Sequence, residues 1–189
     1  MVGNNDILLK KALVELVLAA NEEGVNGRKK LQKIVYLANN AGWNVINDYR
    51  FYLYGPYSQY LLSEVQNLNR TGLIEVEKTT GRFGTPYYLH RITDEGRALL
   101  QELKNEVADS GLIERTVNLV KELNEFSSDQ LELMASLYYL RKQQPSLSDD
   151  ELIHRLGELK PQFTEAAIRD AFRIFEIMTK HTNDSTTNI

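Results

Sequence analysis

The fold is decided by residues 58–72, which read SQYLLSEVQNLNRTG. The apolar residues of this stretch recur at helical spacing and form one face: Leu61, Leu62, Val65 and Leu68. Ser58 can accept a backbone N–H as the N-cap, and Gly72 can end the helix in the left-handed region. The sequence therefore predicts a helix from about Ser58 to Thr71.

The elements predicted around this helix follow the order of a winged helix. An amphipathic helix over 5–23 and a basic one over 28–41 precede an aromatic strand at 50–54, and two alternating runs, 73–78 and 86–92, form a hairpin after the helix. We expect a mainly α protein with a small β-hairpin. A winged helix-turn-helix domain spans 1–107, an all-helical C-terminal module spans 108–180, and a disordered tail rich in Thr and Asn spans 181–189.

The helix over 58–71 carries a polar stripe away from its apolar face. Its members fall at i, i+4, i+8 and i+11, and they are Gln59, Ser63, Asn67 and Arg70. In a DNA major groove, Gln and Asn suit adenine and Arg suits guanine, so these residues are candidate base contacts. A soluble helix also needs a polar side, and Glu64 on the same helix would repel phosphate.

Candidate phosphate contacts form the densest basic cluster of the chain, Arg28, Lys29, Lys30 and Lys33, joined by Lys78 and Arg82 in the hairpin. The first turn of a helix disfavours cations because the macrodipole is already positive there. A cluster placed against that preference indicates an external anion, with DNA phosphate as the candidate, or a solvated basic face.

Tyrosines crowd the strand and the start of the next helix. Tyr52, Tyr57 and Tyr60 are candidate contacts for a protein partner, because a tyrosine brings a large contact area and a hydroxyl at small entropic cost. The alternative is that they form the core and rim of the local fold.

Two short motifs carry a resemblance to a known family. Residues 27–38, GRKKLQKIVYLA, followed by residues 51–58, FYLYGPYS, resemble a family of uncharacterised prokaryotic winged-helix proteins related to the Panacea antitoxin domain. The shared pattern is a Lys-Leu-Gln-Lys helix and an aromatic strand that ends in Tyr-Gly-Pro, and the match covers roughly 31–99. The resemblance implies the winged-helix fold and an antitoxin or adaptor that binds a protein such as a toxin. The wing is more similar to that of PadR-type transcriptional repressors.

Composition narrows the function classes. The chain has 189 residues and no cysteine, which excludes disulfides, thiolate metal sites and cysteine nucleophiles. The net charge of −4 argues against binding nucleic acid by bulk electrostatics. The two halves differ: up to Val107 there are 13 Lys and Arg against 12 Asp and Glu, and beyond it 9 against 14. This asymmetry is compatible with a near-neutral DNA-contacting head on an acidic assembly module.

We predict no catalytic site, cofactor or metal. His90, His154 and His181 lie far apart, and the sequence contains no phosphate-binding glycine loop, nucleophile elbow or metal-binding run. It also contains neither a long apolar run nor a signal peptide, so the expected location is the cytoplasm, with no membrane partner.

The leading hypothesis is a non-enzymatic transcriptional regulator that binds double-stranded DNA. The alternative is a protein-binding antitoxin or adaptor that uses the tyrosine-rich surface. A wide apolar stripe over 168–178 favours a homodimer through the C-terminal helices.

Overall fold

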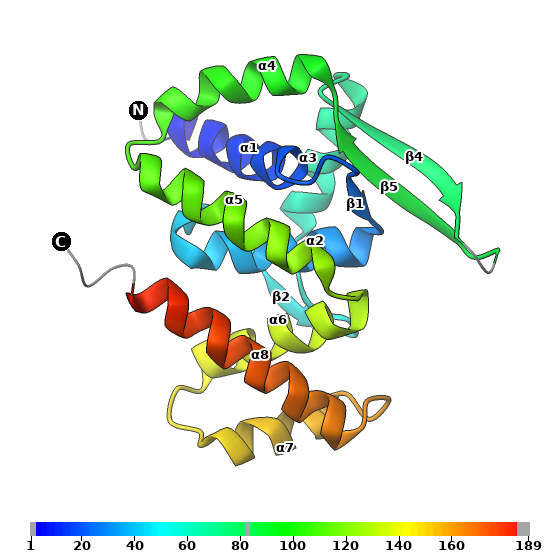
Figure 1. Ribbon diagram of the computed structural model, residues 1–189, viewed down its shortest axis with the longest axis vertical. Helices are drawn as coiled ribbons and strands as arrows, with labels where there is room; N and C mark the ends of the chain where they lie inside the picture. The colour runs from blue at the N-terminus through cyan, green and yellow to red at the C-terminus, as the bar shows by residue number, and fades with distance from the viewer. Residues whose placement is uncertain (1–2, 82–83, 185–189) are drawn as a thin grey trace.

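The computed structural model describes residues 3–81 and 84–184, and it shows a mainly helical protein with a small antiparallel sheet. In chain order the helices and strands are α1 (Gly3–Ala19), β1 (Val25–Asn26), α2 (Arg28–Ala38), β2 (Arg50–Tyr52), β3 (Gly55–Tyr57), α3 (Gln59–Arg70), β4 (Ile74–Thr80), β5 (Pro86–Ile92), α4 (Asp94–Leu103), α5 (Ser110–Glu125), α6 (Ser128–Gln143), α7 (Asp149–Leu159) and α8 (Glu165–Asp184). Figure 1 shows an elongated molecule with α1, α4 and α5 towards one end, α7 at the other, and the β4–β5 hairpin projecting from one side.

The predicted helix over 58–71 is confirmed as α3, with both of its ends as expected. The Ser58 hydroxyl accepts the Leu61 N–H at 2.9 Å, and Gly72 follows the helix with a φ of 77°. The core side of α3 is made by Leu61, Val65 and Leu68. The same N-cap chemistry opens α4 at Thr93, and capping boxes open α6 and α7.

The predicted hairpin is also confirmed, and it belongs to a three-stranded antiparallel sheet. The strand order is β1-β5-β4, with Val25 and Val76 on either side of His90. The Gly27 N–H donates to the Tyr88 carbonyl at 2.7 Å, so the start of α2 is attached to the same sheet. Helix α1 packs against β5, α2 and α4.

The aromatic strand expected at 50–54 forms a separate two-stranded hairpin, β2–β3, because the chain turns back before Gly55 and Pro56. Gly55 has a φ of 80°, and a Cβ atom at this position would lie 2.5 Å from the Ser136 Oγ. The hairpin therefore lies directly against α6. It also lengthens the connection between α2 and α3, so the two helices are not joined by a short turn.

The C-terminal helices pack on the N-terminal elements instead of standing apart from them. Helix α6 is the buried centre of the C-terminal helices, with Leu131, Met134 and Leu137 almost inaccessible. It contacts α2 and β3 on one side and α7 and α8 on the other, while α5 lies against α1 and α2. Hydrophobic residues from both sides of Val107 belong to one core. The domain boundary placed there stays a prediction.

Helix α8 continues to Asp184. The disordered tail predicted from residue 181 is therefore wrong for its first four residues, because a helix can propagate beyond its last apolar residue by adding a hydrogen bond with each residue. The remainder of that prediction, 185–189, lies outside the described residues. Across the described ranges, no helix combines the length and the apolar character needed to cross a membrane.

Candidate functional site

The polar stripe of α3 lies on the molecular surface. Gln59, Ser63 and Arg70 are exposed and Asn67 is partly exposed. The Ser63 hydroxyl donates to the Gln59 carbonyl at 3.1 Å, and the Arg70 guanidinium donates to the Asn67 Oδ1 at 2.8 Å. Four side chains with base-reading chemistry are therefore presented on one helix face, while contact with bases stays a prediction.

Glu64 does not share that face. Its side chain is buried towards α1, where the Tyr60 hydroxyl lies 3.5 Å from its Oε2. On α1, Glu15 is fully buried with neither carboxylate oxygen hydrogen-bonded. Burial raises the pKa of Glu15 to about 7, with Lys11 opposing the shift and Glu64 adding to it. The repulsion of phosphate expected from Glu64 is therefore wrong, because that carboxylate is turned into the protein.

Three members of the basic cluster bind within the protein. The Lys29 Nζ lies 2.7 Å from the Asp129 Oδ1 and 3.1 Å from the Glu132 Oε2, and the Lys30 Nζ donates to the Asn124 carbonyl. Lys33, only 1% exposed, donates to the Pro56 carbonyl at 2.6 Å. The prediction that these lysines hold DNA phosphate is wrong for Lys33. For Lys29 and Lys30, which are partly exposed, it stays a prediction, although residues of α5 and α6 already supply partners for both side chains.

Lys29 and Lys33 belong to an ionic network around the buried Glu132. The Lys160 Nζ lies 2.7 Å from the Glu132 Oε1, and both side chains are 1% exposed. Lys160 also donates to the Leu53 carbonyl, so the network reaches the β2–β3 turn. Burial lowers the pKa of Lys33 to about 7. The Glu132 carboxylate opposes this shift, whereas the positive charges of Lys160 and Lys29 add to it. The Lys-Leu-Gln-Lys and Tyr-Gly-Pro motifs therefore meet in the interior, where they anchor the β2–β3 hairpin.

The remaining predicted cations differ in their surroundings. Arg28 is exposed, with its guanidinium carbon 4.1 Å from the centre of the Tyr88 ring. Lys78 is exposed on β4. Arg82 lies outside the described residues. Of the predicted phosphate contacts in the described part of the chain, Arg28 and Lys78 thus stay available at the surface.

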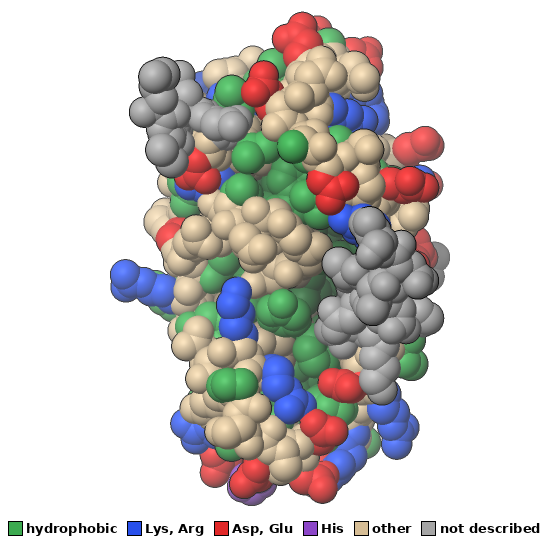
Figure 2. All heavy atoms as spheres, turned by 90° about the vertical axis from the view of Figure 1, so that its left-hand side faces the viewer, with side chains coloured by type: hydrophobic (Ala, Val, Ile, Leu, Met, Phe, Trp, Pro, Cys, Tyr) green, Lys and Arg blue, Asp and Glu red, His purple; other side chains and the backbone are tan. Residues whose placement is uncertain are grey.

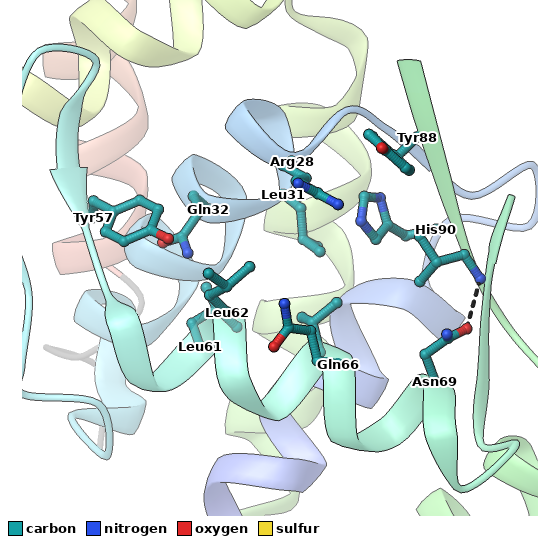
Figure 3. Close-up of a pocket in the computed structure, with 12 residues that line it drawn as sticks. Arg28, Leu31, Gln32, Tyr57, Leu61, Leu62, Gln66, Asn69, Tyr88 and His90 are labelled. Carbon is teal, nitrogen blue, oxygen red and sulfur yellow. Dashed lines mark hydrogen bonds between the residues drawn. The ribbon is translucent and has the colours of Figure 1, made fainter. Parts of the chain in front are cut away.

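A pocket of about 320 Å³ lies between α2, α3 and the sheet. Figure 3 shows Arg28 and His90 above α3, with Gln66 and Asn69 projecting from the helix. The Asn69 Oδ1 accepts the Val76 N–H at 3.0 Å, which ties α3 to β4. The sequence prediction included Arg28 but missed the pocket, because its lining comes from segments that are distant in the chain.

The predicted tyrosine surface separates into two parts. Tyr52 is 55% exposed, whereas Tyr57 and Tyr60 are partly buried; the Tyr57 ring packs at 5.7 Å against that of Tyr52. The most exposed apolar side chains of the β2–β3 turn are its neighbours Leu53 and Tyr54, at 71% and 56%. The sequence analysis missed these two because alternation alone did not reveal the turn. We call Tyr52, Leu53 and Tyr54 the β2–β3 tip.

Figure 2 shows the face on the left-hand side of Figure 1, where acidic and basic side chains are interspersed among hydrophobic ones. Across residues 3–81 and 84–184, no three His, Cys, Asp or Glu side chains come together in a way that could hold a metal ion.

Comparison with known proteins gives a relative but no function. No family model matches the chain. It is 27% identical over 172 residues to the uncharacterized protein YwgA of Bacillus subtilis (strain 168), covering 89% of this chain and 96% of that protein. The similarity thus extends across both the N-terminal elements and the C-terminal helices.

Proposed function

We propose that the protein is a winged-helix DNA-binding regulator in which α3 enters the major groove. The proposal is carried by one observation: α3 presents Gln59, Asn67 and Arg70 to solvent beside a sheet of order β1-β5-β4 whose outer hairpin projects as a wing. The burial of Glu64 supports the proposal, because its carboxylate would then not face the phosphates of a DNA major groove occupied by α3.

The phosphate contacts assigned to this function are fewer than the sequence indicated. Arg28 at the start of α2 and Lys78 on β4 flank α3, whereas Lys30 is held by the Asn124 carbonyl. Each phosphate contact contributes about 0.9 to the slope of log K against log salt concentration. We therefore expect a shallow salt dependence and a large share of the affinity from base contacts.

Selection from a random duplex DNA library tests this function. The parent should enrich a defined sequence, and Asn67→Ala should lose preference at one or more positions of it. Arg28→Ala and Lys78→Ala should weaken all sequences and each lower the salt slope by about 0.9, while Lys30→Ala should leave the slope unchanged. Absence of any enriched sequence with the parent at low salt contradicts the proposal.

A second candidate function is protein binding through the β2–β3 tip. Leu53, at 71% exposed, lies between two exposed tyrosines on a turn whose carbonyl groups are held by Lys160 and Lys33. A rigid apolar tip binds a partner with little loss of conformational entropy, which is the antitoxin or adaptor mode that the family resemblance implies.

This function predicts a partner retained from host lysate at high salt and lost on Leu53→Ser. Ile177→Ser is the matched control, because Ile177 is 58% exposed and lies on α8. Equal loss with both variants, or retention with both, contradicts a specific role for the tip.

A further inference from the structure

The pocket beside the polar stripe has an apolar floor that DNA phosphate does not require. The aliphatic residues that line it are Leu31, Leu61, Leu62, Val65 and Val76. Tyr57 lies at one end of the pocket and Tyr88 near the other (Figure 3). A cavity of about 320 Å³ with such a lining falls within the usual size range of small-molecule sites.

The charge of the pocket comes from a single cation. Arg28 stacks on the Tyr88 ring and makes no ion pair within the described part of the chain. His90 is 1% exposed, and its Nδ1 lies 3.2 Å from the Val25 carbonyl oxygen. Burial lowers the pKa of His90 and Arg28 lowers it further, while the hydrogen bond to the Val25 carbonyl opposes the shift, so the charged form of the imidazole is disfavoured. No carboxylate lines the pocket, which leaves the charge of Arg28 uncompensated there.

Hydrogen-bond donors surround the same end of the pocket. Helix α2 begins there with Gly27 as its N-cap, which offers no side-chain acceptor to the N–H groups of the first turn. A Cβ atom added to Gly27 would meet nothing within 4 Å, so this helix end is open. Gln66 adds an exposed amide from α3. An anion placed in the pocket would meet two side-chain donors, the Arg28 guanidinium and the Gln66 amide.

We propose that this pocket binds a small amphipathic anion, with its flat apolar body on the aliphatic floor between the two tyrosines and its carboxylate against Arg28. A neutral apolar ligand would make no contact with the uncompensated charge of Arg28, and an inorganic anion would leave the aliphatic floor hydrated. The pocket shares Arg28 with the proposed DNA-binding face, but the binding of an amphipathic anion is tested without DNA and does not rest on the proposed function.

Three probes separate the two halves of this recognition. Indole-3-carboxylate carries both the flat body and the anion, indole-3-carboxamide is its neutral isostere, and acetate carries the anion alone. In NMR titrations of the ¹⁵N-labelled full chain, we expect indole-3-carboxylate to bind at least tenfold more tightly than either control, with shifts concentrated at Arg28, Gln66 and Val76. Equal binding of the acid and the amide, or shifts concentrated elsewhere, overturns the proposal.

Variants then test the cation directly. Arg28→Gln should reduce the affinity for indole-3-carboxylate at least tenfold without changing that for the carboxamide, while Arg97→Gln, an exposed arginine on α4, should change neither. A carboxylate beside Arg28 should also raise the pKa of His90, observed as a shift in the titration of its ring proton. Unchanged affinity in Arg28→Gln, or an unchanged His90 titration in the saturated parent, contradicts the assignment.

Discussion

Replacing Glu132 by Gln should destabilise the protein by about 3–5 kcal/mol, because it leaves buried lysines without their anion. The Glu132 carboxylate lies 2.7 Å from the Nζ of Lys160 and 3.1 Å from that of Lys29. Lys160 is 1% exposed and cannot turn to water without disrupting the packing of α7 against α6. The glutamine amide can still accept one hydrogen bond, but it supplies no charge.

Urea denaturation at pH 7 gives the free energy of unfolding for this comparison. Asp129→Asn is the matched control, because it also removes an anion from Lys29 but at a site that is 67% exposed, where an ion pair contributes about 0–1 kcal/mol. The double variant Glu132→Leu with Lys160→Met should recover most of the loss, since it removes both buried charges. A loss in Glu132→Gln no larger than in Asp129→Asn would refute the reasoning.

Two further predictions concern the hairpin anchor and a buried acid. Gly55→Ala should cost about 2 kcal/mol more than Gly72→Ala in chemical denaturation. Both glycines have a positive φ, but an added Cβ atom would lie 2.5 Å from the Ser136 Oγ at Gly55 and would meet nothing within 4 Å at Gly72. Similar losses in the two variants would contradict close docking of the hairpin on α6. Burial raises the pKa of Glu15 to about 7, so between pH 4.5 and 7 the folded protein binds a proton that the unfolded chain has already released. The contribution of Glu15 to the free energy of unfolding is therefore fully present at low pH and is lost as the pH rises through that range. The free energy of unfolding of Glu15→Gln, relative to that of the parent, should therefore increase as the pH rises from 4.5 to 7. A difference between the two proteins that does not change with pH would contradict the buried position of Glu15.

Local patterns in the sequence predicted the regular elements well. The spacing of apolar residues and the turn residues predicted helix α3, its Ser58 cap and the β4–β5 hairpin. These signals all come from residues that are close together in the sequence. The β2–β3 hairpin could not be predicted in this way, because its two strands are three residues each and its turn is held by Lys160, which follows α7 and donates to the Leu53 carbonyl. Tertiary contacts therefore decided what local propensity left open.

The candidate site shows the same limit. The polar stripe of α3 was predictable because helical periodicity places Gln59 and Asn67 on one side. The pairing of the lysines within the protein could not be predicted. The β2–β3 hairpin brings Pro56 to Lys33, and Lys29 contacts Glu132 only when α6 packs beside α2. A basic run identifies charge, but burial and pairing decide whether that charge reaches a ligand.

An NMR titration of the ¹⁵N-labelled protein with a short duplex of mixed sequence at low salt tests the central claim, that α3 and the wing form a DNA-binding face. We expect salt-sensitive shifts at Gln59, Asn67 and Arg70, accompanied by shifts at Arg28 and Lys78, with the β2–β3 tip unaffected. Shifts confined to the tip, or none along α3 at the lowest salt, would contradict it.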